Sequence, residues 1–338
     1  VIPEDILEAG IAPSLDNMRD WSGINTVLAF THRHVGQQYR PNFAPSTDKD
    51  GNVLSSTWVR TDPKYYDDPA LQGKNFDAVN ADFDILDELH EETRPRGMDL
   101  YARILEPYVI TGAIPGLEDW REVNALGEET DHVCFNHPQY IRYWDSVVED
   151  LIRNHPYLDG FKFGQERGGP LLSSLAGGKP GKCFCQHCQD LAKERGLDIE
   201  NARQGYIAVH EYGNRIREGG KLSDGNFVGF LRLLVKYPTL MPWEQFWMDS
   251  REGQRKRIYA KIKSIQPDCQ VGWHLDHGMT WDIISRATHD YTKVGPYTDW
   301  LSVALYFDSI GRRSMGHYER NYQDILFGDA TEDLSYAM

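Results

Sequence analysis

The sequence predicts a (β/α)8 barrel in which about six strands are recognisable, so that the barrel is incomplete toward the C-terminus. Apolar, strand-like runs alternate with helical patterns along the 338 residues, as they do in parallel βα units. Polar side chains follow successive strands at their carboxyl ends, where barrel enzymes hold their reactive groups. An open, doubly wound sheet is the alternative, because the pattern is two strands short of eight.

The first half of the chain is expected to supply three strands, over residues 24–30, 98–105 and 132–135. An acidic amphipathic helix over 78–94 connects the first two. Residues 35–76 carry Pro, Asn, Asp, Gly and Ser together with four Tyr or Trp residues. This stretch is too long for a simple connector and is typical of a binding loop.

The second half begins with Pro138, which opens a helix that extends to about residue 154. The fourth strand spans 158–166, the fifth begins at 270–273 and the sixth spans 299–307. Helical patterns between them cover 188–217, 225–237 and 243–265, with breaks at Pro238 and Pro242. We therefore expect residues 1–338 to form one barrel domain, with a cysteine-bearing loop at 168–188.

Glu166 stands at the carboxyl end of the fourth strand. Because side chains alternate along a strand, Phe161 and Phe163 share one face while Lys162 and Glu166 share the other. If helices cover the aromatic face, Lys162 and Glu166 point into the barrel. The alternative is a structural ion pair of Glu166 with Lys162 or Arg167.

The net charge of −15 argues against nucleic acid or an anionic membrane as the main partner, since both require clustered Lys and Arg. No apolar run approaches the ~20 residues of a membrane span. The chain begins at Val1 without an initiator Met, which indicates a trimmed start. We leave open whether the protein is cytoplasmic or is secreted after losing a leader, and whether it forms a homo-oligomer.

The five cysteines are an odd number, and three of them form a C-x-C-x-x-C motif. Such close neighbours converge on one tetrahedral metal, whereas a disulfide between them is strained. Cys134 lies at the third predicted strand and the motif follows the fourth, so the two are neighbours in a parallel barrel. We expect one structural zinc ion held by Cys134, Cys183, Cys185 and Cys188. Four unligated buried thiols are the alternative, and Cys269 is expected to be a free buried thiol.

Three segments carry a resemblance to a known family: NHPQYIRYW (136–144), LDGFKFGQERGGP (158–170) and CFCQHC (183–188). They resemble the (β/α)8 glycoside hydrolases, and specifically the family 42 β-galactosidases, over about residues 130–195. The resemblance implies that Glu166 is the catalytic acid/base and that the four cysteines named above bind a structural zinc. Two departures place the chain outside the family as a relative: Gln165 replaces the family's Asn, and the seventh strand, which ends in the family's nucleophile, is not recognisable.

The leading functional hypothesis is a retaining glycosidase that acts on a neutral sugar, with Glu166 as proton donor and no organic cofactor. Asp276 and Asp308 follow strands five and six and are alternatives for the second carboxylate, and the third alternative is a nucleophile beyond Met338. The rival hypotheses are a metal-dependent barrel hydrolase or isomerase that uses His274, Asp276, His277 and Glu166, and a carbohydrate-binding barrel without catalysis. The candidate substrate contacts are polar residues near the strand ends: His32, His34, Arg103, Glu106, Asn136, Lys162, Gln165, His274, Asp276, His277 and Asp308.

Overall fold

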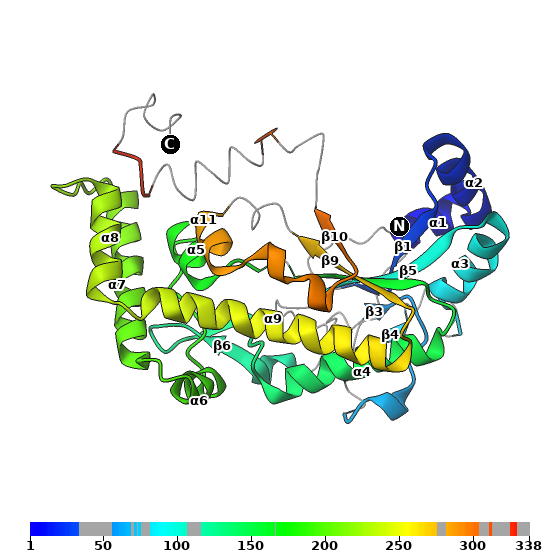
Figure 1. The fold of residues 1–338 in the computed structure, drawn as a ribbon, viewed down its shortest axis with the longest axis horizontal. Helices are drawn as coiled ribbons and strands as arrows, with labels where there is room; N and C mark the ends of the chain where they lie inside the picture. Colours follow the sequence, from blue (N-terminus) through cyan, green and yellow to red (C-terminus); the bar gives the residue numbers. More distant parts are fainter. Residues whose placement is uncertain are drawn as a thin grey trace, which may run out of the picture.

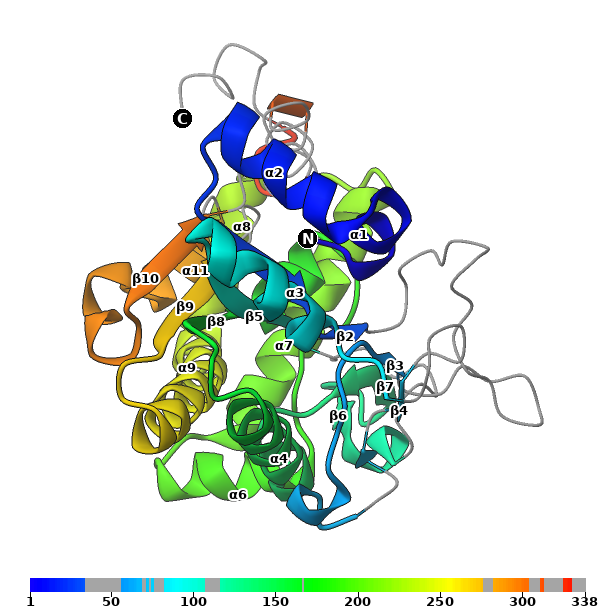
Figure 2. The same ribbon diagram turned by 90° about the vertical axis from the view of Figure 1, so that its right-hand side faces the viewer.

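The computed structural model describes residues 1–33, 56–68, 71–72, 74–75, 82–106, 116–165, 167–275, 282–303, 311–312 and 325–329. Its central sheet contains five parallel strands, hydrogen-bonded in chain order: β1 (Thr26–Phe30), β5 (Asp99–Leu105), β8 (Gly160–Gly164), β9 (Gln270–Leu275) and β10 (Trp300–Val303). Figure 2 shows β10, β9, β8 and β5 in this order across the view. The predicted parallel α/β architecture is confirmed, and the described strands form an open sheet with the strand order of consecutive barrel strands.

The described helices are α1 (Pro3–Ala9), α2 (Ile11–Ser22), α3 (Ile85–Thr93), α4 (Pro138–Asn154), α5 (Pro170–Leu175), α6 (Gln186–Glu194), α7 (Ile199–Arg217), α8 (Asn226–Lys236), α9 (Leu240–Ile265) and α11 (Ile283–Thr288). Short 3-10 turns add η1 (Pro63–Tyr65), η3 (Arg94–Arg96), η4 (Leu117–Trp120), η5 (Tyr291–Lys293) and η6 (Gly295–Tyr297). Helices α4 and α9 run side by side along the sheet, while α7 and α8 stand beyond its end (Figure 1). None of the helices in these ranges is long and apolar enough to cross a membrane.

The face of the sheet that α3, α4 and α9 cover contains the hydrophobic core. Phe161 and Phe163 of β8 are buried there, and the Phe163 ring lies 6.0 Å from the Trp144 ring of α4. Trp273 of β9 faces the same side and donates its indole N–H to the Tyr297 carbonyl at 2.8 Å. Burying each of these aromatic side chains contributes roughly 1.5–3 kcal/mol. The predicted orientation of β8, with its aromatic residues toward the helices, is therefore confirmed.

The packing of aromatic side chains on the opposite face requires two glycines near the amino ends of the strands. A Cβ atom at Gly160 would lie 2.5 Å from the Tyr101 ring, and one at Gly272 would lie 2.1 Å from the Trp300 ring. The two rings meet at a centroid distance of 5.9 Å, and Tyr101 donates its hydroxyl to Gln270. Glycine at both positions thus lets two aromatic side chains lie across the sheet.

The prediction of a central strand at 132–135 is wrong. Residues Glu129–Val133 form β7, which pairs antiparallel with β6 (Arg121–Val123) in a separate two-stranded sheet. Only Val133 of β7 is buried. A central strand of a parallel sheet is covered on both faces and requires a nearly continuous apolar run, which the sequence ETDHV does not provide.

The described part of the predicted 35–76 loop contains structure of its own. Strand β3 (Ser56–Thr57) pairs with β2 (His32–Arg33) and with β4 (Lys74–Asn75). Trp58 is buried in the main core, and the Asp62 backbone N–H donates to Asp150 of α4 at 3.1 Å. Trp58 and Asp62 are thus joined to α3 and α4 rather than projecting as a free loop.

A buried ion pair joins this region to α3 and α4. Asp84 caps α3 through the Leu86 N–H and receives the Arg60 N–H at 2.7 Å, and its carboxylate lies 2.9 Å from His155 Nε2. Because Leu151 O lies 2.8 Å from His155 Nδ1, both ring nitrogens face acceptors, as in a charged imidazolium. Burial lowers the pKa of His155, but the hydrogen bond and charge of Asp84, together with the Leu151 carbonyl and the charge of Asp87, raise this pKa overall.

Replacing Asp84 with Ala is expected to lower the free energy of unfolding by about 3–5 kcal/mol, because it leaves a buried cation without a partner and removes a helix cap. Urea denaturation measures this loss, and Glu88→Ala on the exposed side of α3 is the control. The pKa of Asp84 is lowered in the folded state, so the contribution of the ion pair to stability is lost as pH falls through this pKa. It is also lost as pH rises through the raised pKa of His155. A loss below 1 kcal/mol would contradict the ion pair.

Candidate functional site

Polar side chains lie at the carboxyl ends of successive parallel strands. His32 follows β1, Glu106 follows β5 and Gln165 follows β8. His274 is the next-to-last residue of β9. The Thr31 N–H donates to Arg103 O, and the Glu106 N–H donates to Gly164 O at 2.8 Å, which aligns these ends along one edge. The remaining predicted residues of this edge, His34, Glu166, Asp276, His277 and Asp308, lie outside the described residues.

Three cationic or imidazole side chains occupy the face opposite the helices. Arg103 and Lys162 are paired residues of β5 and β8, and His274 lies beside Gly164 on the next strand. Lys162 is buried, which agrees with its predicted inward orientation. This face therefore favours negatively charged or strongly polar groups.

His32 is neutral at physiological pH. Burial lowers the pKa of its imidazole to about 4, and its Nδ1 lies 3.0 Å from the Thr31 hydroxyl. A neutral imidazole accepts as well as donates hydrogen bonds. The structure thus keeps His32 at the edge in a form suited to binding a hydroxyl group, and this role stays a prediction.

Glu106 is engaged with Arg167, the residue directly after Glu166. The Arg167 guanidinium donates to Glu106 Oε1 at 2.6 Å and to the Val133 carbonyl at 2.5 Å, and it stacks over the Phe135 ring. The Tyr140 hydroxyl also donates to Glu106 Oε1. Burial raises the pKa of Glu106, and the Arg167 charge offsets part of this rise. The Arg167 side chain thereby fixes the chain on one side of Glu166.

Gln165, on the other side of Glu166, is turned toward α9. Its amide nitrogen donates to Gln254 Oε1 at 2.7 Å, and its amide oxygen accepts from Arg255 Nε at 2.9 Å. Both atoms of the amide group are therefore occupied by helix side chains. Direct sugar binding by Gln165 stays a prediction, and the described hydrogen bonds assign this residue to the support of the strand end.

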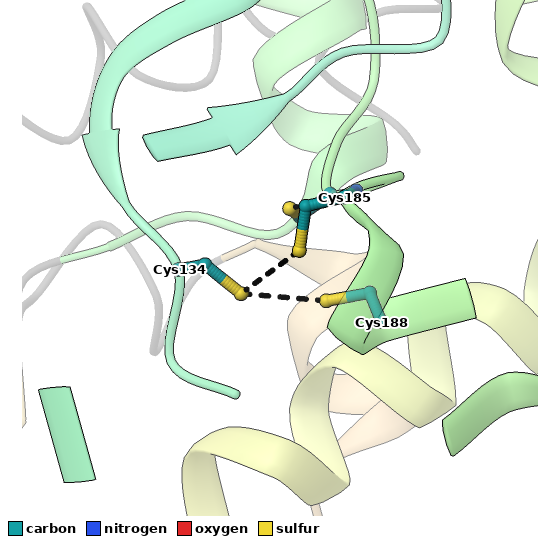
Figure 3. Close-up of side chains that lie close together, drawn as sticks. Cys134, Cys185 and Cys188 are labelled. Carbon is teal, nitrogen blue, oxygen red and sulfur yellow. Dashed lines mark hydrogen bonds between the residues drawn. The ribbon is translucent and has the colours of Figure 1, made fainter. Parts of the chain in front are cut away.

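The four predicted cysteine ligands come together. Their sulfur atoms all lie within 4.8 Å of one another, and all four are buried. Cys134 Sγ is 3.5 Å from both Cys185 Sγ and Cys188 Sγ, and these three side chains point toward one another (Figure 3). A tetrahedral zinc site with Zn–S near 2.3 Å places its sulfur atoms about 3.8 Å apart. The donor set and its spacing fit a zinc ion with four thiolate ligands.

Cys134 reaches this cluster by a different route from the one predicted. It follows β7 of the hairpin, and the hairpin itself pairs with the cysteine loop: the Ala125 N–H donates to Gly181 O and the Phe184 N–H donates to Val123 O. The prediction that the two segments meet is confirmed, although Cys134 does not follow a central strand. Cys269 is a buried free thiol before β9, as expected.

Backbone and amide N–H groups point at the sulfur atoms. The Val123 and Cys185 N–H groups each donate to Cys183 Sγ at 3.4 Å, and the Asn136 N–H donates to Cys134 Sγ at 3.3 Å. The Asn136 side chain donates to Cys188 Sγ and to Ser250 Oγ of α9. Donors of this kind stabilise thiolates. The structure thus places Asn136 beside the cysteines, and its predicted contact with substrate stays a prediction.

Comparisons with known proteins give distant likenesses. No protein-family model matches the chain, and no curated protein matches it. Solved structures with partial similarity include the cold-adapted β-galactosidase of Rahnella sp. R3 (TM-score 0.48, 13% identity, 90% of this chain) and the β-galactosidase of Halorubrum lacusprofundi (0.39, 18%, 68%). A third is the exo-β-N-acetylglucosaminidase of Vibrio harveyi (0.37, 11%, 92%).

This chain spans 38%, 34% and 37% of the lengths of those three structures. All three TM-scores lie below 0.5.

Proposed function

We propose that this chain belongs to a (β/α)8 glycoside hydrolase in which Glu166 is the proton donor of a retaining mechanism. One observation carries the proposal. Polar side chains collect at the carboxyl ends of consecutive parallel strands, where α/β proteins bind ligands, and Glu166 comes two residues after the fully buried strand β8 in the sequence. The resemblance of residues 130–195 to family 42 β-galactosidases supports the same role.

The mechanism requires two carboxyl groups on either side of the glycosidic bond. The first protonates the leaving oxygen, and the second attacks the anomeric carbon, so that the two groups lie about 5–5.5 Å apart in a retaining enzyme. Asp276 and Asp308 follow β9 and β10 in the sequence and are the candidates that this chain offers for the second role. Arg103, Lys162 and His274 contribute a polar inner face that binds sugar hydroxyl groups.

The cysteine cluster holds a structural zinc ion in this proposal. Four thiolates leave no open coordination position, so the metal binds no substrate and activates no water. Its ligands join the β6–β7 hairpin to the glycine-rich loop after Glu166. The cluster thereby stabilises the rim of the candidate active site, while the reaction itself belongs to the carboxyl groups.

Hydrolysis of a panel of neutral nitrophenyl glycosides tests the proposal, with NMR detection of the first anomer released. We expect the product to keep the configuration of the substrate. The anomeric carbon is inverted once when the covalent intermediate forms and again when water hydrolyses it. A product of opposite configuration would exclude the retaining mechanism. Activity lost together with a second metal ion in His274→Ala would favour the metal-dependent alternative, and glycan binding without turnover would favour a binding protein.

A further inference from the structure

Glu244 is a buried carboxyl group near the start of α9, with 1% of its surface exposed. Its Oε2 accepts the Leu171 backbone N–H at 2.9 Å and the Tyr206 hydroxyl at 2.9 Å. Its Oε1 faces Gly169 so closely that a Cβ atom at Gly169 would lie 1.8 Å away. One carboxyl group therefore joins α9, α7 and the first residues of α5.

These contacts fix the chain just after Glu166. Arg167 is attached to Glu106 and Val133 on one side, and Leu171 is attached to Glu244 on the other. Between them, Gly168 and Gly169 have little conformational preference of their own. The position of residues 167–171 thus depends on two buried side-chain anchors, of which Glu244 is the one on α9.

The second partner of Glu244 connects it to the cysteine loop. Tyr206 packs against Gly181, where a Cβ atom would lie 2.1 Å from its ring. The Phe184 ring lies 5.9 Å from Tyr206 and stacks on Trp243 at 4.4 Å. Glu244 therefore lies where the segment after Glu166 meets the loop that carries three of the four cysteines.

The surroundings of Glu244 favour the neutral acid. Both hydrogen bonds converge on Oε2, and within the described ranges no Lys, Arg or His forms a salt bridge with this carboxyl group. An isolated buried carboxylate is strongly disfavoured. Burial, with the nearby Asp282 carboxyl group, raises the pKa of Glu244 to about 8, although the Leu171 and Tyr206 hydrogen bonds lower it in part.

We propose that Glu244 is a positioning residue for the proposed glycosidase reaction, which holds residues 167–171 in place by accepting the Leu171 N–H and the Tyr206 hydroxyl. The proposal rests on the assignment of Glu166 as proton donor for its effect on activity. Its structural part, the anchoring of Leu171, stands apart from that assignment and is measured separately.

The pH dependence follows from the groups around Glu244. Tyr206 on α7 and Asp282 at the start of α11 are the ionisable neighbours, and α5 has no ionisable side chain. When the pKa is higher in the folded state, the folded chain binds more protons than the unfolded chain at pH values between the two pKa values. The contribution of Glu244 to stability is thus complete below the unfolded pKa and is lost as pH rises through about 8.

The test compares Glu244→Gln, Glu244→Leu and Tyr206→Phe in the full chain. The matched control is Asp150→Asn on α4, because Asp150 is also buried and also accepts a backbone N–H and a tyrosine hydroxyl, from Asp62 and Tyr66. Hydrogen–deuterium exchange of residues 167–175 and kcat, KM and stability from pH 5 to 9 are measured for each variant.

We expect Glu244→Leu to speed exchange at Leu171 by about tenfold or more, because this amide loses its acceptor, and to lower kcat more than it raises KM. Glu244→Gln keeps an acceptor oxygen for the Leu171 N–H, so it should retain protection at Leu171. Because it cannot ionise, it should also lose the pH dependence of stability that Glu244 contributes. Tyr206→Phe should have an intermediate effect, and Asp150→Asn should leave this segment unchanged.

Unchanged exchange at Leu171 in Glu244→Leu would overturn the proposal, as would exchange at Leu171 that is as fast in Glu244→Gln as in Glu244→Leu. Faster exchange in a chain without glycosidase activity would instead reject the proposed function and keep the anchoring role. The two failures are thereby distinguishable.

Discussion

Glu166→Gln is expected to lower kcat/KM on alkyl or disaccharide substrates by about 10²–10⁴-fold, the usual contribution of a general acid. The amide is close in shape to the carboxyl group but cannot donate a proton to the leaving oxygen. Substrates with good leaving groups, such as dinitrophenyl glycosides, need less protonation and should lose much less activity. The ratio of the two losses, from steady-state kinetics, is the diagnostic measurement.

The control for this experiment is Glu91→Gln, an exposed glutamate on α3. Thermal denaturation of Glu166→Gln should resemble that of the wild type, so that lost activity reflects chemistry and not folding. An unchanged kcat/KM on an unactivated substrate would remove Glu166 from the acid role. An equal loss on both substrate classes would point to a role in attack rather than in protonation.

Protein purified without chelator is expected to contain one zinc ion per chain, and Cys134→Ser or Cys188→Ser should abolish it. Binding of structural zinc contributes about 10–16 kcal/mol in zinc-finger peptides, which is comparable to the whole stability of about 5–15 kcal/mol of a typical domain. We therefore expect these variants to lose a large part of their stability. Elemental analysis and thermal denaturation measure the two effects.

Cys269→Ser is the matched control, because Cys269 is equally buried and lies outside the cluster. It should keep its zinc and lose only the packing of one thiol. A zinc content below about half an equivalent in the wild type would rule out the site. Loss of stability without loss of metal in Cys134→Ser would show that packing, not coordination, holds these residues together.

Local sequence patterns were sufficient to predict those elements whose structure is determined by residues close in the sequence. Helix α4 matches the predicted range 138–154 because Pro138 starts it and an apolar stripe continues through Leu151. Strands β5, β8 and β9 were predicted from buried apolar runs with alternating faces. Three of the four cysteine ligands were predicted from their spacing, since they lie within six residues of one another, whereas Cys134 was assigned from the predicted strand order and the family resemblance.

Long-range pairing explains what the sequence did not reveal. The amide of Gln165 is bound by Gln254 and Arg255, 89 and 90 positions away, and no local pattern indicates such partners. The pairing of Arg167 with Glu106 is also long-range and is likewise not indicated by a local pattern. The polar residues of β7 were the available evidence against a central strand at 132–135, because a buried parallel strand excludes them.

Glu244 shows how a buried acid escapes detection in a sequence. It lies in α9 among alternating aromatic and charged residues, and its position alone predicts a solvated side chain. Its burial results from the approach of Leu171 and Tyr206, which are 73 and 38 positions away. Only the glycines at 168 and 169 indicated in advance that another part of the chain comes close.

A zinc ion bound to the cysteine cluster would also join two distant parts of the chain into a ring. Cys134 and Cys185 are separated by 51 positions, and the segment between them includes α4, β8 and Glu166. A cross-link around a loop of this length removes about 4 kcal/mol of conformational entropy from the unfolded chain in the polymer model. With metal bound early, the strand that precedes Glu166 would form inside a closed ring of chain. Zinc supplied during refolding should therefore restore more native protein than zinc supplied after it.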